Sequence, residues 1–285
     1  MSVIVFSLLV AGWLYARGTA TVWRLAGRGH GVRVWQAIAF GSGCCAVGAA
    51  LVSPLDALAD NMFSAHMAQH LILITVAAPL LAVSGAHGAF VWALPRRGRT
   101  AVGGVSTRLK WPRDTASLLL AFTVHSVAIW VWHLPALYEG ALRNDAVHAL
   151  EHVVLLGSGV LFWSAATRGL TRAGKTLGAS VLFVFALGAQ STGLGALITT
   201  ARSPWYGWYT TTAPAHGLAV MDDQVLAGAL MWVPAGFVYL GLALLLLGAW
   251  LRPLPGSGKQ NQTERSREQC SSEQRQYHAK PQQVG

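Results

Sequence analysis

The chain has 285 residues, of which 53% are hydrophobic and only 11% are charged, and its formal net charge is +10. Its mean hydropathy is +0.45. A soluble domain of this length cannot bury so much apolar surface, which excludes a soluble globular protein and indicates an integral membrane protein. Because the Lys and Arg residues gather in alternate connections between apolar runs, the positive charge reports membrane topology and indicates no nucleic-acid partner.

Seven apolar runs follow one another along the chain, at residues 3–16, 34–52, 62–83, 115–133, 147–166, 177–199 and 225–251. Most reach the ~20 residues that a helix needs to cross the hydrocarbon layer. The first run is short, so six spans are the alternative. A cleaved signal peptide is disfavoured because no basic segment precedes this run. We therefore predict an all-α fold, a polytopic bundle of about seven transmembrane helices within residues 1–252, followed by a disordered polar tail at residues 253–285.

Charge in the connections predicts the orientation of the bundle. The connections after the first, third and fifth runs are basic, with Arg17, Arg24, Arg28 and Arg33, then Arg96, Arg97, Arg99, Arg108, Lys110 and Arg113, then Arg168, Arg172 and Lys175. The other connections carry Asp56 and Asp60, then Glu139, Arg143 and Asp145, then Arg202, Asp222 and Asp223. The positive-inside rule then places the N-terminus outside and the C-terminus in the cytoplasm.

Two histidine pairs share one spacing, His66 with His70 and His148 with His152. Residues four apart lie on one side of a helix, so each pair can hold one metal ion. Both pairs fall in the outermost turns of their predicted helices. Polar residues inside a membrane tend to face the bundle interior and to mark function, which favours a metal site.

Further ligand-capable residues fall at the same predicted level. His133 ends the fourth run, and Asp222 and Asp223 precede the seventh. Asn144 or Asp145 is a natural N-cap for the fifth helix, which fixes the depth of the second histidine pair. The aspartates are expected to attract a cation or to orient an imidazole through a hydrogen bond.

The ligand types narrow the choice of metal. Neutral imidazole suits zinc, copper, iron and nickel, whereas a thioether favours reduced copper. Met62 lies one turn before His66 on the expected helical stripe, and Met231 lies near the start of the last run, with Met67 and Met221 nearby. Cys44 and Cys45 lie deeper and diverge by about 100° around their helix, so they are interpreted as packing residues. The combination of imidazole and thioether ligands therefore favours Cu(I).

Other readings of the same residues remain open. The sequence His148-Ala-Leu-Glu151-His152 fits the pattern of an inverted zinc peptidase, with Glu151 as general base and Asp222 or Asp223 as third ligand. Histidines at matched depth can also ligate a b-type haem, and a metal-free scaffold would use them only for hydrogen bonds. Membrane di-iron oxygenases need further His-His pairs, which the chain lacks. His125 stays undecided, whereas His30, His87 and His278 are expected to be surface residues.

Several separated motifs resemble one known family. They are SPLDALADNMFSAHMAQHL at residues 53–71, APLL at 78–81, HLPALY at 133–138, VHALEH at 147–152, DDQ at 222–224 and GALMWVPAG at 228–236. In this order they resemble the CtaG family of cytochrome c oxidase assembly factors, the multi-spanning type associated with caa3-type oxidase. The resemblance covers residues 51–251. A single-span copper chaperone that shares the CtaG name is not similar to this chain.

The resemblance implies a non-enzymatic protein of the bacterial plasma membrane that helps copper to reach haem-copper oxidase subunits from the outer side. An extracytoplasmic copper chaperone is a possible donor. By motif position, the functional residues carried over are His66, His70, His133, His148, His152, Asp222 and Asp223. Met62 and Met231 are added from the ligand argument alone.

Overall fold

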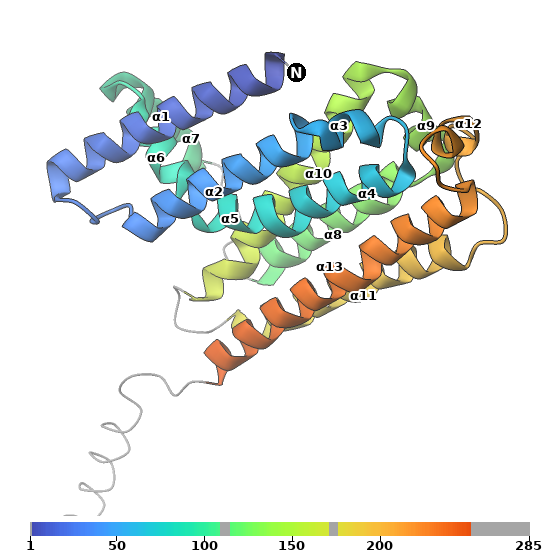
Figure 1. The fold of residues 1–285 in the computed structure, drawn as a ribbon. Helices are drawn as coiled ribbons and strands as arrows, with labels where there is room; N and C mark the ends of the chain where they lie inside the picture. The colour runs from blue at the N-terminus through green and yellow to red at the C-terminus, as the bar shows by residue number, and fades with distance from the viewer. Residues whose placement is uncertain (1, 109–114, 171–175, 252–285) are drawn as a thin grey trace, which may run out of the picture.

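The computed structural model describes residues 2–108, 115–170 and 176–251. Every regular element in these ranges is a helix, which confirms the predicted all-α fold (Figure 1). The predicted tail at residues 253–285 and the residues Lys110, Arg113, Arg172, Lys175 and His278 lie outside the described residues.

The described ranges contain seven helical segments that are long and apolar enough to cross a membrane, which confirms the predicted number. They are α1 (Ser2–Ala26), α2 (Val34–Leu51), the composite Phe63–Val83, α8 (Thr115–Trp132), α10 (Asp145–Ala166), α11 (Leu177–Thr200) and α13 (Val220–Trp250). The composite segment consists of α4 (Phe63–Leu71), the π-helix η1 (Ile72–Ala77) and α5 (Ala78–Val83). The orientation of these segments across a membrane remains a prediction.

The first helix is longer than predicted. It continues to Ala26, so the placement of Arg17 and Arg24 in a connection is wrong. A guanidinium can reach out of an apolar environment while its stem stays on the helix, and that of Arg17 lies 5.3 Å from the ring centre of Trp13. The helix ends where Gly27 adopts a φ of +90°, a left-handed conformation that favours glycine.

Short helices connect the spans at both ends of the bundle. At one end lie α3 (Pro54–Ala59), α9 (Pro135–Arg143) and α12 (Tyr209–Ala215); toward the other lie α6 (Ala86–Ala93), α7 (Arg96–Arg108) and the 3-10 turn η2 (Thr167–Leu170). A proline at the first helical position starts both α3 and α9, where its missing N–H costs nothing. We call the end at which α4, α10 and α13 begin the histidine end; α9 and α12 lie there together (Figure 1).

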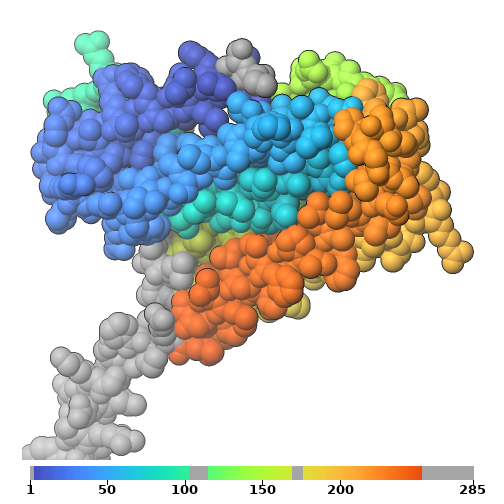
Figure 2. Space-filling view, in the orientation of Figure 1, coloured from blue at the N-terminus to red at the C-terminus, as the bar shows by residue number. Residues whose placement is uncertain are grey.

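The composite span is the best-buried of the seven. Half of its most apolar window is buried, against 17% for the corresponding window of α1. It packs against α2, α10 and α13, whereas α11 and α13 form a long pair on one side of the bundle (Figures 1 and 2). Glycines allow the two helices of that pair to approach closely, since a Cβ on Gly228 would lie 2.7 Å from the carbonyl oxygen of Gly195. The composite span therefore carries its polar residues into the centre of the protein.

Candidate metal centre

The first histidine pair is positioned by a carboxylate from another helix. Asp223, near the start of α13, accepts hydrogen bonds from the backbone N–H of Phe63 at 2.7 Å and of Ser64 at 3.0 Å, and from the Ser64 hydroxyl. These bonds satisfy N–H groups that a helix N-terminus otherwise leaves free. They fix the start of α4, and with it the depth of His66 and His70.

The second pair is positioned by a local cap. The side-chain oxygen of Asn144 accepts from the backbone N–H of Ala146 at 2.9 Å and of Val147 at 3.2 Å. This confirms the predicted start of the helix. Because α10 begins here, His148 and His152 fall in its first two turns.

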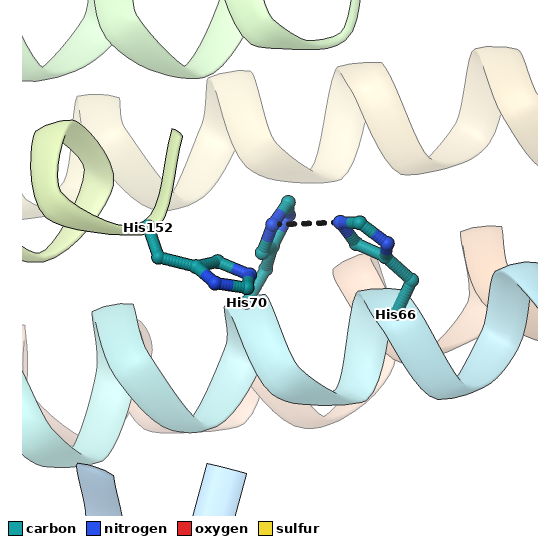
Figure 3. A group of neighbouring side chains, drawn as sticks. All are labelled: His66, His70 and His152. Atoms are coloured by element: carbon teal, nitrogen blue, oxygen red, sulfur yellow. Dashed lines mark hydrogen bonds between the residues drawn. The ribbon is translucent and has the colours of Figure 1, made fainter. Parts of the chain in front are cut away.

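The two pairs meet between α4 and α10. His66, His70 and His152 point toward one another, and the Nε2 atoms of His66 and His70 are 3.0 Å apart (Figure 3). The ring centres of His70 and His152 are 5.4 Å apart. Each of the three offers a ring nitrogen within 4.8 Å of the other two. All three are buried, with 0%, 3% and 7% of their surface exposed, respectively.

A second group of three overlaps the first at His66. It consists of His66, His148 and Glu151, whose ligand atoms also lie within 4.8 Å of one another. The Glu151 carboxylate lies 3.8 Å from Nε2 of His66 and 3.6 Å from Nε2 of His70. The sequence pattern predicts Glu151 only as a peptidase base, and its place in this cluster was not predicted. Its position three residues after His148, on the same helix face and inside a membrane span, was the available signal.

His133 lies beside the cluster rather than within either group. Its ring centre is 6.0 Å from that of His70, and its Nδ1 is 2.7 Å from the carbonyl oxygen of Ile129. Tyr206 donates a hydrogen bond to the carbonyl oxygen of His133 at 2.9 Å. The structure thus fixes the end of α8 next to the histidines of α4.

Three tyrosines pack next to the cluster at the histidine end of the bundle. Tyr138 and Tyr206 stack with ring centres 4.0 Å apart, and the hydroxyls of Tyr138 and Tyr209 are 3.1 Å apart. The Tyr209 hydroxyl also lies 3.5 Å from Nδ1 of His66. Burial raises the pKa of the Tyr138, Tyr206 and Tyr209 hydroxyls above their ordinary values, so these groups stay neutral hydrogen-bonding partners.

The remaining candidates lie apart from the two groups. Asp222 is exposed, whereas Asp223 is buried and engaged with α4. Met62 is the half-buried N-cap of α4 in an extended conformation, so the expectation that it continues the helical stripe of His66 is wrong. The helix starts one residue later because the carboxylate of Asp223 caps it at Phe63. Met231 lines a cavity that His70 and His133 also line.

The other histidines and the cysteines also lie elsewhere. His125 is buried two turns deeper, where its Nδ1 lies 2.8 Å from the hydroxyl of Ser158. The exposed residues His30, His87 and His216 lie outside the cluster, and the surface placement of the first two confirms the prediction. Cys44 and Cys45, the cysteines within the described ranges, are not in a disulfide.

The donor atoms of the cluster fit a metal ion. Nδ1 of His70, Nε2 of His148 and His152 and both carboxylate oxygens of Glu151 are buried without a hydrogen-bond partner among the described residues. Buried polar atoms in a folded protein nearly always have a partner, which can be an ion or an ordered water. Two nitrogens bound to one tetrahedral ion at ~2.0 Å lie about 3.3 Å apart, close to the His66–His70 separation. Imidazole with one carboxylate suits zinc, copper or iron.

Comparison with known families identifies the protein family of this chain. A family model described as cytochrome c oxidase caa3 assembly factor matches residues 13–253. The chain belongs to this family. The match includes every residue of both three-membered groups, which also lie within the motifs on which the resemblance was based. No curated protein and no solved structure matches the chain. A role in assembling the oxidase, in association with it and in a membrane, follows from the family.

Proposed function

We propose that this protein handles copper for the assembly of a haem-copper oxidase and catalyses no reaction. It holds Cu(I) as cargo at the cluster formed by His66, His70, His148, His152 and Glu151, and passes the ion to an oxidase subunit. The observation that carries the proposal is the pair of overlapping ligand groups that share His66. In this proposal the protein lies in the bacterial plasma membrane with the histidine end outside, where a copper chaperone can supply the ion.

The location of the cluster supports transfer rather than permanent storage. His148 is half-buried, whereas His66 and Glu151 are fully buried. An ion can therefore be received at His148 and moved inward by replacing one ligand at a time around His66. The acidic residues Asp56, Asp60 and Asp145 are close enough to interact electrostatically with His148, which favours the approach of a cation. The basic connections toward the opposite end of the bundle support an outward-facing histidine end.

The geometry disfavours the competing functions. A haem needs space between imidazoles of two helices, but the rings of His66 on α4 and His148 on α10 stack with their centres 5.1 Å apart. A peptidase built on His148 and His152 needs a third ligand, and the buried carboxylate of Asp223 is occupied at the start of α4. A metal-free scaffold accounts for the hydrogen bond between His66 and His70, but it gives no partner among the described residues to the Glu151 carboxylate or to Nε2 of His148 and His152.

Histidine replacement tests the proposal. His66→Ala should remove copper from the cluster in the purified protein, because His66 belongs to both groups, and His148→Ala should slow loading. In cells, both variants should lower the copper content and activity of the oxidase while the variant protein remains in the membrane. His87→Ala and His216→Ala are matched controls, since both residues are exposed and outside the cluster.

The outcomes separate the alternatives. Copper measured by metal analysis, with no Soret band in the absorption spectrum, supports the proposal. A Soret band that disappears in His66→Ala would establish the haem function instead. Metal-free protein whose histidine variants still support a normal oxidase would leave only the scaffold.

A further inference from the structure

A small cavity of about 30 Å³ lies next to the cluster, on the side facing the middle of the spans. Its lining includes His70 and Met67 from α4, His133 from the end of α8 and Met231 from α13. One water molecule needs about 10–15 Å³ of such space. A bare metal ion is smaller than a water molecule. The cavity can therefore hold at least one small ligand, next to these imidazole and thioether side chains and to apolar ones such as Leu71 and Ile74.

His133 presents a free lone pair in this region. A carbonyl oxygen only accepts hydrogen bonds, so the 2.7 Å contact with Ile129 requires the proton to be on Nδ1. Nε2 is then unprotonated in the neutral ring. It is buried without a hydrogen-bond partner among the described residues, and His133 as a whole is 4% exposed. This is the tautomer in which a metal-binding histidine donates from one nitrogen to a carbonyl and coordinates through the other.

Two thioethers reach the cavity from different helices. Met67 is 1% exposed and Met231 is 9% exposed. Methionine often fills irregular gaps in an apolar core, but here a cavity persists beside both side chains. Thioether sulfur is a poor ligand for divalent zinc and a good one for Cu(I). The pairing of two thioethers with one or two imidazoles therefore specifies the metal more narrowly than the histidine cluster does.

We propose that this cavity is a second Cu(I) site, formed by His133, Met67 and Met231 and joined to the cluster through His70. The inference rests on the proposed copper function and adds an inner, softer site to it. His70 is shared, because its ring centre lies 4.5 Å from that of His66 and 6.0 Å from that of His133. An ion can pass from the cluster to the cavity by exchanging ligands around His70, and the softer donors retain only Cu(I).

The test uses the full-length purified protein, loaded anaerobically with Cu(I) or with Zn(II) and studied by metal analysis and X-ray absorption. Wild-type protein should show sulfur scattering around Cu(I) and bind about one equivalent more Cu(I) than Zn(II). The Met67→Leu/Met231→Leu double variant should lose the sulfur scattering and that extra equivalent. It should keep its nitrogen scattering and its Zn(II) binding. Replacing methionine by leucine conserves volume, so the double variant should keep its fold. Its elution volume and its circular dichroism spectrum check this.

Met62→Leu is the matched control, because Met62 is half-buried and does not line the cavity. It should leave the sulfur scattering unchanged. A second variant, His133→Gln, should also remove the extra Cu(I) equivalent.

Copper bound only by nitrogen and oxygen, equal in wild type and double variant, would mean that the cavity holds water. That result overturns the inner site and leaves the proposed function intact. Protein that binds no Cu(I) at all overturns both. If the sulfur scattering is lost in Met62→Leu and kept in the double variant, the thioether ligand is Met62, and the inference is refuted.

Discussion

Asp222 and Asp223 are adjacent, and the structure gives them different roles. We predict that Asp223→Ala destabilises the protein and weakens copper binding without changing the atoms that coordinate copper. The carboxylate of Asp223 accepts hydrogen bonds from two backbone N–H groups and a hydroxyl at the start of α4, and the side chain is fully buried. The exposed Asp222 makes no such contribution to α4, which makes Asp222→Ala the matched control.

The magnitude follows from those bonds. A buried donor left without a partner costs about 1–3 kcal/mol, and loss of a helix N-cap about 0.5–2 kcal/mol. The Ser64 hydroxyl can turn to another acceptor, so the two N–H groups account for most of the lost stability. Asp223→Ala should therefore lower the free energy of unfolding by about 2–6 kcal/mol. Asp223→Asn keeps one oxygen and should cost less, about 1–2 kcal/mol. Asp222→Ala should stay within about 0.5 kcal/mol of wild type.

Thermal unfolding in detergent, followed by tryptophan fluorescence, measures the stability difference. A Cu(I) titration against a competing chelator measures the affinity, and X-ray absorption reports the ligands. Loss of an oxygen ligand from copper in Asp223→Ala would make Asp223 a ligand and refute the reasoning. Equal effects of Asp222→Ala and Asp223→Ala would show that both act only by attracting the cation.

Two further predictions concern the cluster and the helix packing. Glu151→Gln keeps the shape of the side chain but removes its charge, and should weaken Cu(I) binding roughly 10- to 100-fold in the same titration; unchanged affinity would exclude Glu151 from the site. Gly228→Ala should lower stability by about 1–3 kcal/mol, because its Cβ would lie 2.7 Å from the carbonyl oxygen of Gly195, whereas Gly241→Ala, which meets nothing within 4 Å, should be neutral or stabilising. Equal melting of the two glycine variants would contradict the close packing of α11 and α13.

The sequence predicted the spans well because hydrophobic length is a direct physical requirement of the membrane. Five of the seven predicted runs end within two residues of the helix boundaries in the structure. The two exceptions are the first run and the start of the last run. Arg17 suggested an end at residue 16 although α1 continues, and the acidic pair suggested a start at residue 225 although α13 already begins at Val220. Charged residues mark a helix boundary poorly here, because the Arg17 guanidinium contacts the ring of Trp13 and the Asp223 carboxylate caps α4.

The candidate site could be predicted only in part. The spacing of the histidine pairs and the alternation of helix direction place His66, His70, His148 and His152 at one end of the bundle. Neither pattern gives the rotation of each helix about its axis. Adjacent residues differ by about 100° around a helix, so only one of Asp222 and Asp223 can face α4, and only the packed structure tells which. Glu151 is a different case, because its spacing from His148 already places it on the same helix face.

The π-helix below the first histidine pair shows how one residue can determine a shape that sequence patterns do not predict. Pro79 has no N–H to donate to the carbonyl oxygen of Thr75, and in a regular α-helix its ring would press against that carbonyl. In the structure the preceding turns widen, with the N–H of Ala78 bonded to the carbonyl oxygen of Leu73 five residues earlier. Trp163 of α10 donates to the carbonyl oxygen of Ile74 at 3.3 Å.

The widened turns therefore accommodate the proline without a break in the best-buried span. They add a residue between the histidines and α5, which shifts the helical phase of everything that follows by about 100°. The π-helix η1 therefore determines which α5 side chains face α2 and α10. Counting a regular helical period from His70 does not give them. A sequence prediction that continues the regular helical period through Pro79 will assign the wrong face to α5, even though it places the span and its histidines correctly.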